Sequence, residues 1–512
     1  MRLQVGNCEM VAESGATTWL STALSRSAYR TIDLGGVWHL FALVLVVILG
    51  VTFRVYLLDS GMGYDESFTY LHYASQPLAV GMSDYSYPNN HIFHTLLVHI
   101  TYRTLGDAPW VLRLPACLAG VLIMPAVYAL GRLMYNKHAA LLSTAFAACS
   151  WPLISYSTQS RGYTLLCLVF LLLLIIAIHI GRSSGLAPWL TLAVLAALGF
   201  YTIPIMLYPF GVVVLWILLG IVFQPRDVGR AVLLRRLCGS VLLSALLTGL
   251  LYLPVFLVSG VSSLVSNRFV APLTWDVFVA QWPGVIPDVW TYWNLDVPAP
   301  VSWLLALGFA VALVRPQKLT DPGVALVAAV VLWIFPLVLL QRVVPPTRVW
   351  LFLLPLYLLL ACAGLTDLLQ RGTSQLRKAG ASILPLATVL FPLWFSANYL
   401  VNVTEYFGPR GPTSCRGFEG VARVLAARLE PHDRVLAIPD AWSLRFYMRR
   451  AGLDDASLVK ELESAPRVLA VAWPKGSLGH LMDTGLPNGV KYGTPVLVED
   501  CGFASIYELS RS

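Results

Sequence analysis

The feature that most limits how this chain can fold is its series of long apolar runs. Of its 512 residues, 57% are hydrophobic and only 12% are charged, which is about half the charged share of a typical soluble domain. A helix needs about 20 apolar residues to cross a bilayer, so the chain has room for roughly ten to twelve spans. This pattern excludes a soluble enzyme, a disordered chain and a fibrous protein.

Eleven runs are apolar enough to be predicted as membrane spans. They are Val37–Leu58, Trp110–Leu133, Ala139–Tyr156, Tyr163–Ile180, Leu186–Tyr201, Pro204–Phe223, Leu237–Val258, Pro300–Val314, Val324–Leu340, Val349–Leu369 and Ile383–Leu400. A further run, Asn90–Leu105, carries three histidines and Arg103. Polar and charged groups are costly at a bilayer centre, so we predict that this run is a helix lying in the membrane interface.

The distribution of basic residues tests this count. If Asn90–Leu105 does not cross, fifteen Lys and Arg residues fall on one side of the membrane and about seven fall in loops or at span ends on the other. That asymmetry is what the positive-inside rule predicts. We therefore expect a multi-pass protein of the inner (plasma) membrane with a cytoplasmic N-terminus. The net charge of +8 then reflects topology and does not indicate nucleic-acid binding.

Composition divides the chain into three parts. We predict a cytoplasmic segment at 1–36, a transmembrane domain at 37–401 whose first outer loop is 59–109, and a small outer α/β domain at 402–512. In the last part Arg434–Ile438 and Arg467–Trp473 resemble strands, and Ser443–Gly452 resembles a helix closed by glycine. Cys415 and Cys501 also fall there, either as a disulfide or as two free thiols.

The first outer loop is the richest in groups that can do chemistry. Asp65 and Glu66 directly follow the first span in a glycine-containing turn, and no Lys or Arg follows before Arg103. One carboxylate could act as a base while the other orients a partner or a cation. The alternative is that both acids are solvated and cap the helix that starts near Ser67, because acidic side chains favour a helix N-terminus.

Basic residues also occur on the outer side, where the topology rule does not require them. Arg161 lies between serines and Tyr163 at a span end, and Arg342 and Arg348 flank a Pro-Pro pair. A guanidinium can grip phosphate oxygens in a bidentate way, so these residues could bind the phosphate of a lipid. The alternative for Arg161 is that it snorkels from the end of a span.

Histidines in the outer loop raise the question of a metal. His91 and His94 would share a helix face and could bind a divalent cation together with Asp84 or Glu66. The alternative is that they simply pack at the interface. The sequence itself requires no cofactor, since it contains no Walker loop, no GxSxG and no CxxC.

The order of four segments resembles a known family. YDESFTYL follows the first span, and YPNNHIFHTLL, RLPACLAGVLIMPAVYALGRLMY and SYSTQSRGYTLL come after it. This order is similar to that of membrane glycosyltransferases with the GT-C fold, of the family-39 type that includes protein O-mannosyltransferases and the aminoarabinose lipid A transferase. The likeness is best over about 54–180. It implies a polytopic helical fold with an interfacial helix in the first outer loop.

The resemblance also implies roles for individual residues. Asp65 matches the family's general base or acceptor-positioning acid, and Glu66 would assist it. Arg161 matches an arginine near the lipid-phosphate pocket, next to Tyr163. Arg342 and Arg348 correspond only loosely to later phosphate-binding residues.

One turn departs from the family pattern. The family has Pro-Pro-Leu before the interfacial helix, whereas this chain has Pro88-Asn89-Asn90. Tyr87 and His91 flank that turn and are candidates for substrate contacts.

The reaction implied by the resemblance moves a hexosyl or pentosyl sugar from a polyprenyl-phosphate donor. The acceptor would be a lipid, glycan or protein at the outer face, and the transfer would be an inverting single displacement. Two other functions stay open from the residues. A lipid or sugar transporter or flippase would need charged groups or broken helices near the midplane. A non-catalytic envelope assembly protein would act through its outer tail.

Overall fold

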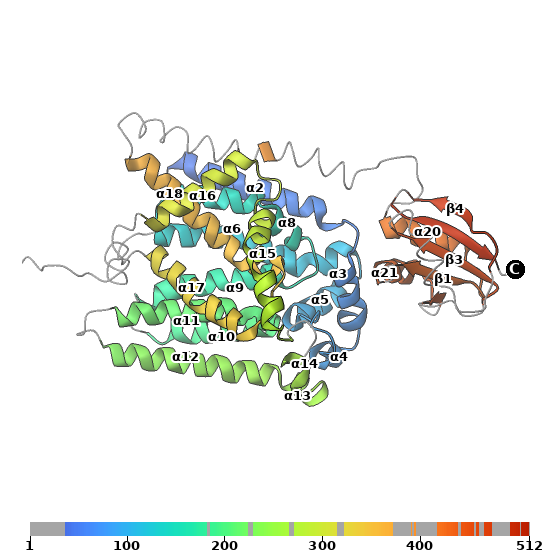
Figure 1. The fold of residues 1–512 in the computed structure, drawn as a ribbon, viewed down its shortest axis with the longest axis horizontal. Helices are drawn as coiled ribbons and strands as arrows, with labels where there is room; N and C mark the ends of the chain where they lie inside the picture. The colour runs from blue at the N-terminus through green and yellow to red at the C-terminus, as the bar shows by residue number, and fades with distance from the viewer. Residues whose placement is uncertain are drawn as a thin grey trace, which may run out of the picture.

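The structure is a computed structural model and describes residues 36–181, 185–223, 229–265, 271–314, 322–371, 391, 394–395, 417–438, 442–454, 457–459, 465–473, 492–501 and 503–510. It consists of a large helical bundle with a small sheet-containing unit at one end, next to the loop that follows the first helix (Figure 1).

The bundle is built from helices that overlap ten of the eleven predicted runs, although the run Leu237–Val258 is divided between α12, which begins earlier at Arg230, and a short helix at Leu253–Val258. These elements are α2 (Val37–Leu58), α6 (Pro109–Met134), α7 (Lys137–Cys149), α8 (Trp151–Ser157), α9 (Tyr163–Ile180), α10 (Ala187–Thr202), η2 (Pro204–Met206), α11 (Leu207–Val222), α12 (Arg230–Leu251), α16 (Ala299–Val314), α17 (Pro322–Gln341), η3 (Thr347–Leu353) and α18 (Leu354–Arg371). By length and composition, six described helices can cross a membrane, or seven if one bent pair is a single span. The count of eleven stays a prediction, because Ile383–Leu400 lies mostly outside the described residues.

The predicted span Ala139–Tyr156 is not one straight helix. Helices α7 and α8 meet at Ser150 with a bend of 58°. Pro152 stands in the first turn of α8, where it lacks the N–H that a continuous helix would use and its ring clashes with the preceding turn. The sequence run shows only apolar character, so it could not reveal this break.

Short helices cover the end of the bundle near the sheet unit (Figure 1). They are α3 (Tyr64–Thr69), η1 (Tyr70–Ala74), α4 (Leu78–Ser83), α5 (Ile92–Leu105), α13 (Leu253–Val258) and α14 (Ser262–Val265). A longer helix, α15 (Trp275–Trp293), follows α14 in the chain. Helix α5 has 14 residues and so rises about 21 Å, short of the ~30 Å hydrocarbon core. The interfacial position of Asn90–Leu105 stays a prediction, because α10 and α16, which coincide with predicted spans, have only 16 residues each.

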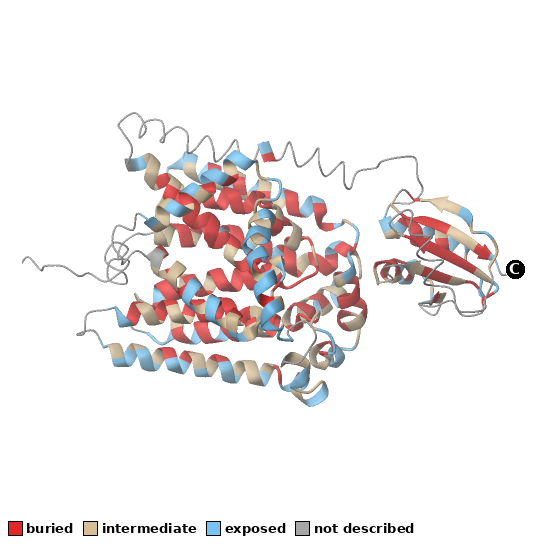
Figure 2. Cartoon of the chain, viewed as in Figure 1, coloured by how far each residue is buried: buried red, intermediate tan, exposed pale blue. Residues whose placement is uncertain are grey.

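Close helix packing holds the interior, and Figure 2 shows buried residues throughout it. A Cβ on Gly364 would collide with the carbonyl oxygen of Gly308, and a Cβ on Gly308 would collide with Ala361. Small residues therefore allow the backbones of α16 and α18 to touch, which is a common way to pack helices in a membrane.

The C-terminal unit is an α/β sheet unit, as predicted. Its strands are β1 (Arg434–Ile438), β2 (Leu458–Val459), β3 (Arg467–Ala472), β4 (Val496–Asp500) and β5 (Ser505–Ser510), and its helices are α20 (Gly417–Arg428) and α21 (Trp442–Arg450). The strand order is β2-β1-β3-β5-β4, with β1 parallel to β2 and β3 and the other two pairings antiparallel. Cys501 is disulfide-bonded, while Cys415 lies outside the described residues.

Helix α21 attaches this unit to the first outer loop. The Met62 N–H donates to the Tyr447 hydroxyl over 2.9 Å, and the Arg450 guanidinium lies 3.4 Å from the Asp107 carboxylate. The Trp442 and Phe68 rings meet edge to face, with centroids 4.8 Å apart. The sheet unit therefore packs against α3, the helix that carries Asp65 and Glu66.

Candidate active site

The two adjacent acids occupy different environments. The backbone N–H of Gly63 donates to Glu66 Oε1 over 2.8 Å, so Glu66 caps α3 in the manner of a capping box. Asp65 does not cap the helix, because its Oδ1 accepts from the Asn89 side-chain amide at 3.2 Å. The capping alternative therefore holds for Glu66 alone, and Glu66 is buried rather than solvated.

Glu66 belongs to a buried ion pair with Arg113 of α6. Arg113 Nη2 donates to Oε1 over 2.5 Å, Arg113 Nε donates to Oε2 over 3.0 Å, and the Ser160 N–H donates to Oε2 over 2.7 Å. Together with the bond from Gly63, each carboxylate oxygen accepts two hydrogen bonds. Glu66 is therefore saturated with donors and joins α3 to α6 and to the turn before α9.

Arg113 has further short bonds to the end of α2 and the following turn. Its guanidinium donates to the carbonyl oxygens of Leu58, Ser60 and Gly61 over 3.0, 2.6 and 2.9 Å. A buried guanidinium needs such acceptors, because without these hydrogen bonds the full cost of removing its charge from water is not offset. Arg113 thus fixes the loop that presents the acids.

Asp65 remains accessible. Its side chain is 45% exposed, and Oδ2 lies 3.8 Å from Arg161 Nη2. This arrangement brings together Asp65 and Arg161, which are about 100 residues apart in sequence. It leaves one carboxylate oxygen able to take a further partner.

Arg161 is buried but weakly bonded. Its Nη1 donates to Thr69 Oγ1 and to the Asn89 carbonyl oxygen, both at 3.3 Å, and its Nη2 lies 3.4 Å from His91 Nε2. All these distances exceed the usual ~2.9 Å. The guanidinium is thus held in position without strong partners, which leaves it able to bind an incoming anion.

His91 and His94 stand behind Arg161 as neutral rings. The Gly162 N–H donates to His91 Nδ1 over 2.9 Å, so that nitrogen is an acceptor. Burial, reinforced by the positive charge of Arg161, lowers the pKa of His91 well below its ordinary value and the pKa of His94 to about 3.

The metal site considered for His91, His94 and Asp84 is not assembled. Asp84 lies 3.6 Å from His72 and accepts from the Ser86 N–H. Within the described part of the chain, no three His, Cys, Asp or Glu side chains form a group that could hold a metal.

Tyr163 and Arg348 extend the site. Arg348 Nε donates to the Tyr163 hydroxyl over 3.1 Å, and the Tyr163 ring meets His91 edge to face at 5.2 Å. The Arg161 guanidinium lies 5.8 Å from the centre of the same ring. Tyr163 therefore connects the two arginines, and Arg348 is close enough to Asp65 to interact electrostatically with it.

Two predicted residues lie outside this group. Arg342 has a left-handed backbone (φ 50°), and its guanidinium lies 5.6 Å from the centre of the Trp275 ring. Tyr87 is half exposed and packs edge to face on Phe68 at 5.2 Å. Tyr87 thus lies at the rim, beside Asn89, and does not contact the arginines through any bond found among the described residues.

The sequence did not single out Arg113 or Asn89. Arg113 lies within the apolar run Trp110–Leu133, and a lone arginine within an apolar helix must find acceptors. Asn89 stands where the family pattern has a second proline, and its amide and carbonyl contact Asp65 and Arg161. The departure from the family pattern was therefore the signal for Asn89.

Comparison with known proteins shows which family and which solved structures the chain is similar to. Residues 90–247 match the family model described as dolichyl-phosphate-mannose-protein mannosyltransferase. No curated protein matches the chain by sequence. The crystal structure of ArnT from Cupriavidus metallidurans in the apo state matches with a TM-score of 0.57 and 14% identity, over 91% of this chain and 97% of that one.

The same enzyme bound to undecaprenyl phosphate matches with a TM-score of 0.53 and 15% identity, again over 91% of this chain and 97% of that one. At such identities the likeness establishes the fold. The chain therefore has a GT-C fold similar to that of ArnT, and the match to the mannosyltransferase family model is confined to residues 90–247.

Proposed function

We propose that this protein is a membrane glycosyltransferase that moves a sugar from a polyprenyl-phosphate donor to an acceptor hydroxyl at the outer face of the membrane. The observation that carries the proposal is the pairing of a half-exposed carboxylate, Asp65, with a buried and weakly bonded guanidinium, Arg161. Sugar transfer from a lipid phosphate needs both groups: a base for the acceptor and a cation for the leaving phosphate.

In the proposed transfer, each proton, bond and charge is accounted for by these residues and the two substrates. The acceptor hydroxyl gives its proton to the free oxygen of Asp65, and its oxygen forms a new bond to the anomeric carbon. The bond from that carbon to the phosphate oxygen breaks, and the electron pair leaves with the polyprenyl phosphate. Arg161 and Arg348 stabilise the developing charge. Attack from the face opposite the phosphate inverts the anomeric centre in a single displacement.

Glu66 does not serve as the base in this proposal. Its oxygens already accept four hydrogen bonds, two of them from Arg113, so it offers no free lone pair in an accessible direction. Its role is to hold α3 so that Asp65 faces the site.

The ArnT complex supports the donor class, because that protein, which shares the fold, is bound to undecaprenyl phosphate. The outer-face assignment rests on the asymmetry of basic residues between the loops. We place the C-terminal unit on the same side, since it packs against α3. The sugar is a hexose or pentose, and the acceptor is a lipid, glycan or protein.

The test is the Asp65→Asn variant, assayed for transfer from a radiolabelled polyprenyl-phosphate sugar. We expect a loss of about 10²- to 10⁴-fold, which is the contribution typical of a positioned general base. Asp84→Asn is the matched control, because Asp84 is an acid of the same loop outside the site, and it should retain transfer. Unchanged transfer by Asp65→Asn in folded protein would contradict the proposal and favour a transporter or an assembly protein.

A further inference from the structure

A group of aromatic side chains lies beside Asp65, where α3 meets the sheet unit (Figure 1). Phe68 follows Asp65 by three positions on α3, so the two side chains are neighbours on the helix surface. The rings of Tyr87 and Trp442 both pack on Phe68, with centroids 5.2 and 4.8 Å away and planes turned by 80° and 85°. We refer to Phe68, Tyr87 and Trp442 as the aromatic rim.

The aromatic rim combines one buried ring with two accessible ones. Phe68 is buried, whereas Tyr87 is 47% exposed and Trp442 is partly exposed. The Arg445 guanidinium lies 5.0 Å from the centre of the Trp442 ring. Tyr and Trp rings are apolar on their faces and carry a polar group at the edge. The rim therefore offers apolar ring faces with hydrogen-bonding groups beside them.

The rim is continuous with the proposed base. Tyr87 stands two residues before Asn89, and the Asn89 side-chain amide donates to Asp65 Oδ1 over 3.2 Å. Asp65 is itself 45% exposed. An acceptor that places a hydroxyl at Asp65 therefore brings its adjoining atoms within reach of Phe68 and Tyr87.

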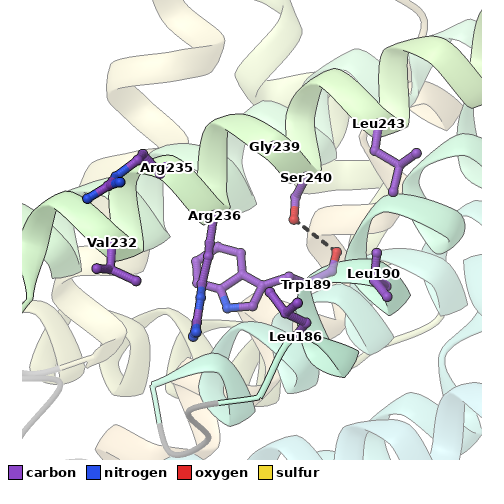
Figure 3. Close-up of a pocket in the computed structure, with 9 residues that line it drawn as sticks. All are labelled: Leu186, Trp189, Leu190, Val232, Arg235, Arg236, Gly239, Ser240 and Leu243. Carbon is purple, nitrogen blue, oxygen red and sulfur yellow. Dashed lines mark hydrogen bonds between the residues drawn. The ribbon is translucent and has the colours of Figure 1, made fainter.

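A groove of about 440 Å³ between α10 and α12 does not offer an alternative acceptor site. Its lining includes Trp189 and Arg235 (Figure 3). Trp189 lies in the first turn of α10, which returns from the far end of α9, and α9 begins at Tyr163 beside Arg161. An acceptor bound in this groove would lie at the opposite end of the bundle from Asp65.

We propose that the aromatic rim binds a sugar ring of the acceptor, so that the acceptor is a glycan or a glycolipid. This inference rests on the glycosyl transfer proposed above. A sugar ring carries C–H bonds on its faces and hydroxyl groups around its edge, so it packs on an aromatic face while its hydroxyls reach polar groups alongside. Tyr87 and Trp442 supply the faces, and Arg445 supplies hydrogen-bond donors. Because Trp442 and Arg445 belong to α21, the sheet unit contributes part of the acceptor site.

The two other acceptor classes suit the rim less well. The acyl chain of a lipid lies in the bilayer, whereas Trp442 belongs to the sheet unit beyond the end of the helical bundle (Figure 1). An extended peptide is commonly held by main-chain hydrogen bonds along the edge of a sheet. The rim is formed by α3, α21 and the loop before α5, and none of these three segments presents a strand edge.

The first experiment identifies the bond that the full chain forms in membranes containing its native acceptor, with a radiolabelled polyprenyl-phosphate sugar as donor. We expect product label that survives alkaline β-elimination and that methylation analysis places on a hydroxyl of another sugar. Label released from serine or threonine, or label attached to a lipid without sugar, would overturn the inference and leave the proposed function standing. Absence of any transfer would overturn both.

The second experiment tests the rim itself through Tyr87→Ala, assayed with a dilution series of detergent extract from the same membranes as acceptor. The apparent KM for the acceptor should rise about two- to tenfold, as expected for the loss of one aromatic contact. The rate at saturating acceptor and the KM for the donor should stay within about twofold. Tyr87→Phe keeps the ring and should restore most of the acceptor affinity. Trp442→Ala should raise the acceptor KM in the same way.

Trp110→Ala is the matched control, because Trp110 is 40% exposed at the start of α6 and lies outside the rim. It should keep the acceptor KM of the unchanged protein. An unchanged acceptor KM in Tyr87→Ala would overturn the inference, and so would a lower maximal rate without a change in KM. Thermal unfolding checks that each variant is folded; if Trp442→Ala is not, Tyr87→Ala and Tyr87→Phe decide, since Tyr87 is half exposed and outside the sheet unit.

Discussion

The two sides of α3 carry arginine–carboxylate pairs that differ in burial and in the distance between the charged groups. On one side Glu66 and Arg113 are both buried and exchange bonds of 2.5 and 3.0 Å. On the other side Asp65 is half exposed, and Arg161 approaches it only to 3.8 Å. Asp65 and Glu66 are adjacent on one short helix, but their environments suit different roles.

The difference follows from how many partners each guanidinium has. Short, charge-assisted hydrogen bonds are strong. The Arg113 guanidinium donates such bonds to Glu66 and to three carbonyl oxygens. Among the described residues, the Arg161 guanidinium has only contacts of 3.3 Å or longer. A saturated pair fixes geometry, whereas an unsaturated pair can rearrange around a substrate. We infer that the first pair holds the loop and the second does chemistry.

The largest effect is expected from breaking the saturated pair. Glu66→Ala leaves the Arg113 charge buried without its carboxylate, and such a loss costs about 3–5 kcal/mol. We expect a sharp fall in the melting temperature and in the yield of monodisperse protein. Fluorescence-detected thermal unfolding in detergent measures this.

Asp65→Ala is the matched comparison. Its partner is farther away and its carboxylate is half exposed, so the stability cost should be at most about 1 kcal/mol. Similar melting temperatures for the two variants would show that the pairs are equivalent and would remove the basis for the distinction.

The next effect concerns activity. Arg161→Gln keeps hydrogen-bond donors but removes the charge that faces the leaving phosphate. We expect transfer to fall by about 10²- to 10³-fold, as when a transition-state donor is removed, with a smaller fall in melting temperature than Arg113→Gln shows. Rates at saturating donor, measured alongside thermal unfolding, separate the two effects.

Arg103→Gln serves as the control for charge alone, because Arg103 is exposed at the end of α5. If Arg161→Gln retained most of its transfer rate, Arg161 would be a structural arginine like Arg113.

The sequence predicted most of the bundle because apolar runs are a local property. Helices α2 and α9 begin and end where their runs do. Strands were also expected at Arg434–Ile438 and Arg467–Trp473, and the structure has them at Arg434–Ile438 and Arg467–Ala472. The parity of the spans predicted only that Asp65 and Arg161 share a side of the membrane, and it did not predict their approach to 3.8 Å, which is a tertiary contact. These predictions needed only hydropathy and the parity of the spans.

Side-chain partnerships could not be predicted in the same way. Arg342 and Arg348 are six positions apart, yet only Arg348 reaches Tyr163, because the chain turns through a left-handed residue at 342 before η3 begins. Which acid Arg113 meets depends on how α6 packs against α3. Such facts depend on tertiary contacts, and one sequence does not contain a pattern for them.

The smallest effect concerns the neutral rings behind the unsaturated pair. His94 is fully buried, and neither ring nitrogen has a hydrogen-bond partner among the described residues. Its pKa is lowered from 6.5 to about 3 by burial, with a smaller contribution from Arg161. The folded protein therefore keeps His94 neutral at a pH where the unfolded chain protonates it.

The sign follows from this difference. Above pH 6.5 neither state binds the proton and His94 has no effect on the pH dependence of stability. As the pH falls from 6.5 toward 3, the unfolded state binds one more proton, so stability is lost at about 1.4 kcal/mol per pH unit. His94→Leu removes that term, and its melting temperature should fall less steeply between pH 6.5 and pH 5 than that of the unchanged protein.

The comparison uses slopes, so a constant packing cost of the leucine does not disturb it. Equal slopes for His94→Leu and the unchanged protein would mean that His94 is protonated in the folded state. Arg161 would then face a second buried cation, and its weak bonding would have to be explained by repulsion rather than by readiness for a phosphate.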